Sequence, residues 1–269
     1  MNYLPKNLNF KEGIAYIGET SLTDVAKNYG TPLYVYDWEH LKGNIDAFTE
    51  AFGKDALFRY AAKAFISKAL VKELDEKGWG IDVVSGGEMA TVQETVGTLE
   101  NTVFNGTFKR TDEIEYFIQN NGGHISIDNR YEIEMLEKAA SSLKKKQPVI
   151  MRINLDVGAE THPMVLTSGY DQQFGISISF AEEALNQIAS SKSLLFSGIH
   201  VHIGSQIKDP ERYKLAMSSC SEFMNSNLEK VEGEAVFNAG GGFFSPYAGE
   251  EVDHELSVYS KAIHDGIKE

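Results

Sequence analysis

The sequence alternates between short apolar runs and longer charged stretches, and this alternation constrains the fold more than any other feature. Each apolar run has the length of a β-strand, and the stretch after it has helical spacing, which is typical of βα units that build a parallel sheet. The predicted strands are 57–62, 81–84, 102–104, 124–127, 149–154, 195–202 and 235–238. The predicted helices are 67–77, 87–96, 111–120, 130–145, 180–190, 211–230 and 253–268.

Seven units with evenly spaced helices favour an α/β fold of the (β/α)₈ barrel type. A doubly wound sheet is the alternative, which the pattern alone leaves open, although no GxGxxG motif begins any predicted helix. Segment 33–37 (LYVYD) is either an additional strand or a lead-in across the edge of the barrel. The longest connection, 156–174, is a candidate functional loop because long loops in compact domains often carry function.

The charge balance limits the classes of partner. The chain has 25 Lys and Arg against 39 Asp and Glu, a net charge of −14, which repels nucleic-acid backbones and anionic membranes. No apolar run approaches the roughly 20 residues that span a bilayer, and the N-terminus lacks the apolar core of a signal peptide. With Cys220 as its single cysteine, the chain cannot form an internal disulfide. We therefore expect a cytoplasmic protein that binds neither nucleic acid nor membranes.

In a barrel of parallel strands, the functional residues lie where each strand ends. Lys63 follows the first predicted strand and is flanked by Ala62 and Ala64, which leave room for a ligand beside its amine. A lysine in a partly dry barrel mouth is a candidate for Schiff-base chemistry, whereas a lysine at an arbitrary strand end is a solvated surface residue. Both interpretations of Lys63 stay open on this evidence alone.

Three consecutive glycines, Gly240, Gly241 and Gly242, follow the last predicted strand. Without side chains, the backbone can approach a ligand closely and point N–H groups at an anion. Phosphate sites in such barrels lie in the loops after the seventh and eighth strands. This position favours a phosphate site over the alternative of a flexible turn.

His200 and His202 are two residues apart at a strand end, which predicts that both side chains project to one face. Such a pair can bind a divalent metal if Asp156 and His162 supply further ligands. In a second interpretation, one imidazole lies flat against an aromatic cofactor ring while Ser205 donates to the ring's substituents. A third is a buried, hydrogen-bonded histidine pair.

Several motifs occur in order at the predicted strand ends. They are YAAKA at 60–64, DVVSGGE at 82–88, FNG at 104–106, TH at 161–162 with FGI at 174–176, GIHVHIGSQ at 198–206, and GGG at 240–242. With these motifs the sequence resembles the diaminopimelate decarboxylases, within the alanine-racemase-type pyridoxal-phosphate (PLP) barrels. The resemblance runs from about residue 10 to the last residue.

The resemblance implies a role for each candidate residue. Lys63 would form a Schiff base with pyridoxal 5'-phosphate, His202 would stack on the pyridine ring and Ser205 would hydrogen-bond near the cofactor. Gly240–Gly242 would bind the phosphate, and Asp82 would belong to the polar shell beneath Lys63. The implied activity is decarboxylation of an amino-acid substrate, meso-2,6-diaminopimelate, to L-lysine. A homodimer is implied for the full-length form.

The sequence also departs from the family pattern at Phe65, Gln173 and Phe243–Phe244. The family's eighth strand and its C-terminal β-domain have no counterpart, so we expect an incomplete barrel, a truncated chain and little activity. Residues 1–32 are expected to be the segment that associates with the missing β-domain, and 33–269 the PLP-binding barrel domain. Two alternatives are a non-catalytic PLP-binding barrel and a metal-dependent hydrolase that uses His200 and His202.

Overall fold

The computed structural model describes residues 7–155, 174–246 and 255–268. The chain divides into two compact units. One comprises Met1–Ala56 with Phe243–Lys261, and the other Leu57–Gly242 with Ala262–Glu269. The second unit contains all the described candidate site residues.

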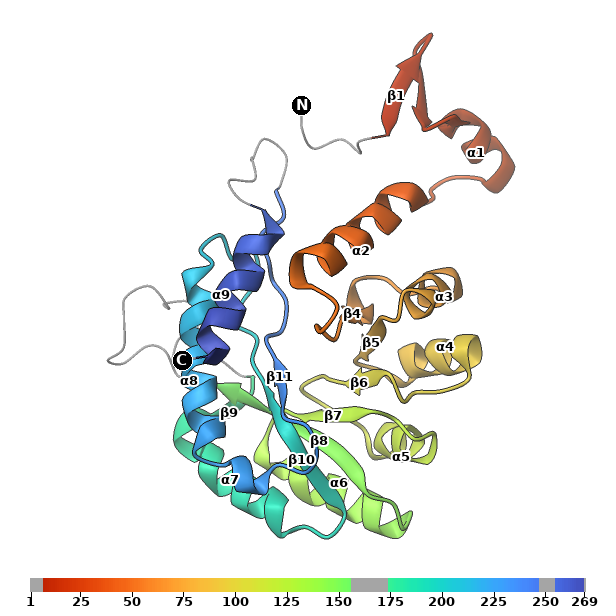
Figure 1. Ribbon diagram of the computed structural model, residues 1–269. Coiled ribbons are helices and arrows are strands. Elements are labelled where there is room, and N and C mark those ends of the chain that lie inside the picture. The colour runs from red at the N-terminus through yellow and green to blue at the C-terminus, as the bar shows by residue number, and fades with distance from the viewer. Residues whose placement is uncertain (1–6, 156–173, 247–254, 269) are drawn as a thin grey trace. The chain divides into compact units, whose positions relative to one another are not determined.

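The second unit is built on one parallel sheet, drawn as a curved row of arrows in Figure 1. Its strands are β4 (Arg59–Ala61), β5 (Gly80–Val83), β6 (Thr102–Phe104), β7 (His124–Ile127), β8 (Gln147–Asn154), β9 (Ile176–Ser177), β10 (Leu194–His200) and β11 (Val236–Asn238). The order along the sheet is β11-β10-β8-β7-β6-β5-β4, with the short β9 paired to β8. This order follows the chain without the reversal of a doubly wound sheet, so the fold is of the barrel class.

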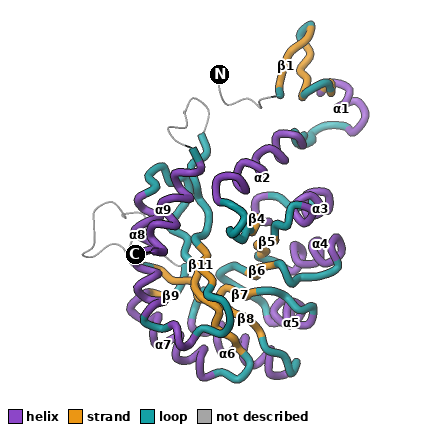
Figure 2. The backbone as a smooth tube through the Cα atoms, in the orientation of Figure 1, coloured by secondary structure: helices purple, strands orange, loops and turns teal. Residues whose placement is uncertain are grey.

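Helices join the strands and lie along the outer side of the row, as Figure 2 shows for α3 to α7. They are α3 (Lys68–Glu76), α4 (Gly86–Val96), α5 (Thr111–Gln119), α6 (Arg130–Ser142), α7 (Ile178–Ser190) and α8 (Glu211–Asn225). The last helix, α9 (Leu256–Lys268), follows β11 and is divided between the two units at Lys261. Each of α3 to α7 buries one apolar stripe; α5, for example, buries Ile114, Phe117 and Ile118. The amphipathic spacing seen in the sequence therefore corresponds to packing against the sheet.

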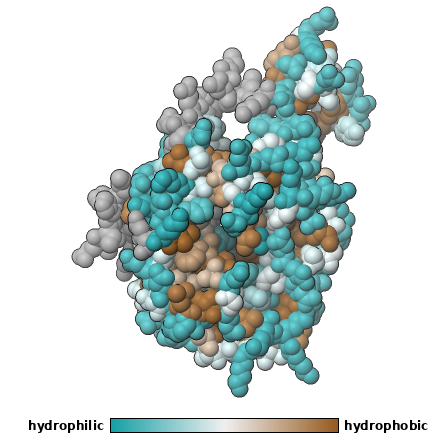
Figure 3. Space-filling model, in the orientation of Figure 1, coloured by the Kyte–Doolittle hydropathy of each residue, from teal (hydrophilic) through white to brown (hydrophobic). Residues whose placement is uncertain are grey.

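Burial is greatest in the middle of this sheet and least at its two outer strands. Every residue of β6 is buried, whereas β4 and β11 are half-buried throughout. Among the described residues, β4 pairs only with β5 and β11 only with β10. On the face viewed in Figure 3, apolar side chains are visible among the polar ones over this unit.

The first unit begins with a small antiparallel sheet. It consists of β1 (Leu8–Lys11), β2 (Ile14–Ile17) and β3 (Thr20–Ser21), followed by α1 (Leu22–Tyr29) and α2 (Trp38–Phe52). Residues 33–37 form a loop, so the interpretation of this segment as an additional strand is wrong. Tyr34 is 93% exposed, and the Asp37 carboxylate begins α2 by accepting the His40 N–H at 3.1 Å.

An aromatic cluster explains one departure from the family pattern. The Phe243 ring packs against Phe52 and Phe48 of α2, with centroid distances of 5.5 and 5.9 Å. Tyr259 of α9 meets Phe243 at 5.3 Å. The large side chain directly after the glycines therefore serves as a packing residue of the first unit.

Other differences from the sequence prediction are shifted element ends and a strand that was not predicted. The helix predicted to run to 145 ends at Ser142, because Lys144 has a left-handed φ of 52°. The helix predicted over 211–230 ends at Asn225, and Leu228–Lys230 form a separate 3₁₀ turn. The strand β9 was not predicted. Within the described residues, no helix combines the length and apolarity needed to cross a membrane.

Candidate active site

Lys63 lies in a 3₁₀ turn, Ala62–Ala64, that begins where β4 ends. Its side chain is exposed. The Tyr60 hydroxyl closes the turn by donating to the Phe65 carbonyl at 2.9 Å. That bond uses a backbone oxygen, which any residue supplies, so the unusual Phe65 preserves it.

Asp82 lies on β5, where it pairs in register with Ala61 of β4. Its carboxylate accepts a hydrogen bond from Asn105 Nδ2 at 2.9 Å. Burial raises the pKa of Asp82 to about 6, an effect that the Asn105 hydrogen bond and the positive charge of Lys63 partly oppose. A carboxyl with this pKa can hold or release a proton near neutral pH beside Lys63.

The rest of the DVVSGGE motif builds the start of α4. The Ser85 hydroxyl accepts the Glu88 N–H at 3.4 Å, and the Glu88 carboxylate accepts the Val84 N–H at 2.7 Å. The Gly86 N–H donates to Glu113 of α5 at 2.8 Å. The motif therefore combines one candidate site residue, Asp82, with a helix cap that fixes the end of β5.

His200 and His202 lie in different environments. His200 ends β10, is 4% exposed, and shares a 3.1 Å hydrogen bond between its Nδ1 and Ser126 Oγ. Burial holds the pKa of His200 well below its usual value. His202 follows the strand and is half-buried, and burial together with the positive charges of Arg152 and Lys63 lowers its pKa to about 4. Both imidazoles are neutral at neutral pH.

An ion pair next to the histidines was missed by the sequence analysis. Arg152 Nη1 on β8 donates to Asp128 Oδ1 at 2.8 Å, and the two side chains are 12% and 3% exposed. The Arg152 guanidinium also lies 5.2 Å from the centroid of the Phe174 ring. Gly175, with φ +85°, lets β9 approach β8 so closely that a Cβ there would lie 3.1 Å from the Arg152 carbonyl. The FGI motif thus places an aromatic ring on Arg152.

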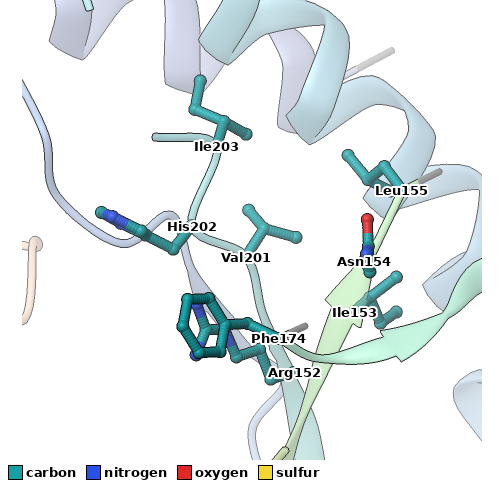
Figure 4. Close-up of a pocket in the computed structure, with 8 residues that line it drawn as sticks. All are labelled: Arg152, Ile153, Asn154, Leu155, Phe174, Val201, His202 and Ile203. Carbon is teal, nitrogen blue, oxygen red and sulfur yellow. The ribbon is translucent and has the colours of Figure 1, made fainter. Parts of the chain in front are cut away.

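A pocket borders this ion pair, and Figure 4 shows the side chains around it. Its lining comes from the carboxyl end of β8, from Phe174, and from the segment after β10. The lining residues are Arg152, Ile153, Asn154, Leu155, Phe174, Val201, His202 and Ile203. Through His202 the pocket adjoins the predicted cofactor residues, and it is both apolar and positively charged.

The three glycines form a turn whose backbone is held at three points. The Gly240 N–H donates to Asn238 Oδ1 at 2.9 Å and the Gly241 carbonyl accepts from the Tyr213 hydroxyl at 3.0 Å. The Gly242 carbonyl accepts the Ile207 N–H at 2.9 Å. Among the described residues, the N–H groups of Gly241 and Gly242 have no acceptor.

Two of these three positions require glycine because of their backbone conformation and their close neighbours. Gly240 and Gly242 have φ values of +69° and +93°, and an added Cβ would overlap the carbonyls of Val201 and Gly204 respectively. A Cβ at Gly241 would meet nothing within 4 Å. Within the described part of the chain, the space at the middle glycine is therefore open.

Ser205 and His202 adjoin the glycine turn. A Cβ on Gly242 would lie 3.3 Å from the Ser205 Cα, and one on Gly240 would lie 3.2 Å from His202 Nδ1. Ser205 is exposed. The candidate residues lie at or just beyond the carboxyl ends of β4, β5, β10 and β11, which belong to one parallel sheet, so the structure brings all the described ones to the same edge.

The metal interpretation receives no support from the described residues, where no group of three His, Cys, Asp or Glu is arranged to hold an ion. Asp156, Thr161, His162 and Gln173 lie outside the part of the chain that the structure describes. Cys220 is buried, and burial raises the pKa of its thiol to about 12, so it is not a nucleophile.

Residues 39–269 match the family model of the pyridoxal-dependent decarboxylases, pyridoxal binding domain. The chain belongs to this family. Among its relatives, diaminopimelate decarboxylase of Aquifex aeolicus is 32% identical over 264 residues, covering 97% of this chain and 63% of the relative. That of Zymomonas mobilis is 36% identical over 251 residues, covering 91% of this chain and 59% of the relative. The predicted resemblance is confirmed.

Solved structures of these pyridoxal-dependent decarboxylases have the same fold. Diaminopimelate decarboxylase from M. jannaschii matches with a TM-score of 0.87 at 29% identity, covering 97% of this chain and 62% of that one. The enzyme from Helicobacter pylori, solved in complex with L-lysine, matches with 0.82 at 28% identity, covering 91% and 62%. This chain thus spans about three-fifths of the length of the relatives it matches. The predicted barrel of the PLP-binding type is confirmed.

Proposed function

We propose that the second unit binds pyridoxal 5'-phosphate at the carboxyl edge of its sheet, with Lys63 as the residue that holds the cofactor's aldehyde carbon. One observation carries the proposal. An exposed lysine, a neutral imidazole and a glycine turn, which follow β4, β10 and β11, lie at the same edge of the sheet. Family membership independently supports the same cofactor.

The residues present fit such a cofactor. The phosphate would accept hydrogen bonds from the N–H groups of Gly241 and Gly242, where the open space at Gly241 admits a ligand. Ser205, exposed beside that turn, would add a hydroxyl donor. The flat, uncharged ring of His202 would face the cofactor's ring, and a neutral imidazole suits such stacking.

When bound, the cofactor supplies an electron sink that lets a substrate amino acid lose its carboxylate as CO₂, after which a proton takes its place. The chain's own residues position the reactants. Lys63 holds the cofactor, and Asp82 beside it, with its pKa raised to about 6, can take up or release a proton there. Arg152, fixed by Asp128, keeps positive charge beside the pocket, where a carboxylate of the substrate would be attracted.

For the whole protein we propose decarboxylation of meso-2,6-diaminopimelate to L-lysine, because the relatives are diaminopimelate decarboxylases and two of them were solved with L-lysine. We further propose a homodimer in the cytoplasm. Residues 1–32 are proposed to associate with a β-domain of the whole protein. The small β1–β2–β3 sheet is compatible with that role.

The cofactor proposal is tested by borohydride reduction of the PLP-treated chain, followed by peptide mapping. The expected result is one phosphopyridoxyl group on Lys63. A label on another lysine, or bound cofactor without any labelled lysine, would overturn the assignment. For the substrate, CO₂ release is compared between meso-diaminopimelate, L-lysine and L-ornithine in the whole protein, and a preference for either of the latter two would refute the proposal.

A further inference from the structure

A second lysine, Lys109, lies buried close to the candidate site and has no role in the function proposed above. It follows β6 in the loop that leads to α5, and its side chain is 0% exposed. A buried ammonium is costly unless it is paired and hydrogen-bonded. Its partners therefore indicate why it is there.

Lys109 makes two kinds of polar contact, and its Nζ also lies 5.7 Å from the centroid of the Phe104 ring. Its Nζ forms an ion pair with Glu132 of α6, with N–O distances of 2.9 and 3.1 Å. The same Nζ donates to the Gly106 carbonyl at 2.7 Å. The carboxylate neutralises the buried charge, while the carbonyl bond fixes the turn directly after β6.

From Gly106 a chain of hydrogen bonds leads to the candidate site. The Gly106 N–H donates to Asn105 Oδ1 at 3.2 Å, and Asn105 Nδ2 donates to Asp82 Oδ2 at 2.9 Å. The Gly106 N–H points at the Asn105 side-chain oxygen, which fixes the orientation of the amide and turns its NH₂ group toward Asp82. Gly106 has φ +109°, so this arrangement uses a conformation that a residue with a side chain rarely adopts.

We propose that Lys109 is a positioning residue, which locks the Asn105–Gly106 turn and thereby aims the Asn105 amide at Asp82 next to Lys63. The role of Asp82 in cofactor binding rests on the function proposed above, but the positioning itself does not. Glu132 is the counterion that makes the buried lysine tolerable. A role in stability alone would leave Asp82 unaffected once the fold is kept.

The experiment uses the double variant Lys109→Met/Glu132→Gln. It removes both charges together, so no unpaired charge stays buried, and replacing a buried ion pair in this way is often tolerated. Glutamine is a near-isostere of Glu132, and its amide oxygen can still accept the Asp128 N–H, which the Glu132 carboxylate accepts at 2.9 Å. The matched control is Lys68→Met/Glu94→Gln, the same pair of changes at an ion pair of 2.7 Å whose side chains are both 64% exposed.

The first readout needs no cofactor. The titration of Asp82 is followed by ¹³C NMR of the carboxyl groups and assigned with Asp82→Asn. Charged groups acting on Asp82 are Lys63, Glu88, Arg152 and Arg59. All four are unchanged in the variant, so a shift reports on Asn105. We expect the Asp82 midpoint to rise by about half a pH unit or more, because a hydrogen bond to the charged form is lost.

Asn105→Ala should reproduce this rise of the Asp82 midpoint. Combining it with the double variant should add little, because both act through one chain of hydrogen bonds.

The second readout is the affinity for pyridoxal 5'-phosphate, which we expect to fall about threefold to tenfold in the double variant and to stay unchanged in the control. If the parent chain itself fails to bind the cofactor, the proposed function fails, while the Asp82 titration still decides the role of Lys109.

A double variant that unfolds cooperatively in urea and keeps the parent midpoint for Asp82 would overturn the proposal. If this variant does not fold, Gly106→Ala tests the same chain with the ion pair intact. A Cβ at Gly106 would lie 3.6 Å from the nearest atom of Val84, so the change strains the turn without a clash. Here too an unchanged Asp82 midpoint in the folded variant would contradict the inference.

Discussion

The two sides of the candidate site are built in different ways. At the ends of β4, β5 and β6, the site consists of side chains: Lys63 is exposed, and Asp82 is held by Asn105. At the ends of β10 and β11, it consists mainly of backbone, with a glycine turn held at three points. The first side depends on which functional groups are present, and the second depends on the absence of side chains.

This difference predicts that changes on the first side alter chemistry with little effect on folding, whereas changes on the second side act through the backbone. Lys63 contacts solvent, so removing its side chain leaves no cavity. A side chain at Gly242 would overlap the backbone carbonyl of Gly204, in the segment that follows β10.

The largest effect is expected for Lys63→Ala. Borohydride should then place no phosphopyridoxyl group on the protein, because the amine to which we assign the cofactor is gone. The free energy of unfolding should change by less than about 0.5 kcal/mol, as for other exposed residues. Mass spectrometry and urea unfolding measure the two quantities. Lys68→Ala is the control and should label like the parent; a labelled Lys63→Ala protein would refute the comparison.

Gly242→Ala is expected to lower the free energy of unfolding by about 2–3 kcal/mol, because the new Cβ meets the Gly204 carbonyl at a φ of +93°. Gly241→Ala has neither problem, so its cost should stay below about 1 kcal/mol. Urea unfolding of the two variants side by side measures the difference. Equal costs would show that the turn readjusts and that its shape is not fixed by the chain.

Gly241→Val is expected to weaken the binding of pyridoxal 5'-phosphate by about tenfold, the cost of roughly one hydrogen bond to a charged group. The side chain would enter space that the chain leaves open and that we assign to the phosphate. An absorbance titration measures the affinity. Gly87→Val, at an exposed position in α4 with no atom within 4 Å of an added Cβ, is the control. Equal affinities for the two variants would indicate that the glycines form a turn without binding the phosphate.

The smallest effect concerns the pH dependence of stability. The folded pKa of His202 is about 4 and its ordinary value is 6.5, so the unfolded chain binds more protons between these values and His202 makes stability rise with pH. The folded pKa of Asp82 is about 6 against an ordinary 3.8, so between these values Asp82 makes stability fall with rising pH. The two sides of the site therefore act in opposite directions.

Removing either group should reveal the contribution of the other to the pH dependence of stability. Across about pH 4.5 to 6.5, stability should rise less steeply in His202→Asn and more steeply in Asp82→Asn than in the parent, where the buried His200 acts in the same direction as His202. Urea midpoints at several pH values measure the slopes. Parallel curves for all three proteins would show that neither group has a shifted pKa.

The sequence predicted the fold class and the order of the strands because the apolar runs are local and strongly periodic. It placed β6 and β7 at their observed residues. It selected Lys63 and the glycine turn as candidates from their positions after strands, and Asp82 from the resemblance to the family. It missed β9, whose two residues are too short to show a pattern and pair with β8 only through the close approach at Gly175. It left segment 33–37 undecided because an exposed apolar loop and a strand have the same composition.

The sequence alone determined which residues could carry chemistry, since strand ends and glycine runs follow from periodicity and conformational freedom. Only the tertiary structure decided how these residues are held. Lys109 and Glu132 lie 23 positions apart in the chain, and Arg152 and Asp128 lie 24 apart. Neither pair belongs to a local pattern, because an ion pair between separate elements depends on which strands are neighbours in the sheet. The different burial of His200 and His202 was also decided by the tertiary structure, because the two residues are only two positions apart in the sequence.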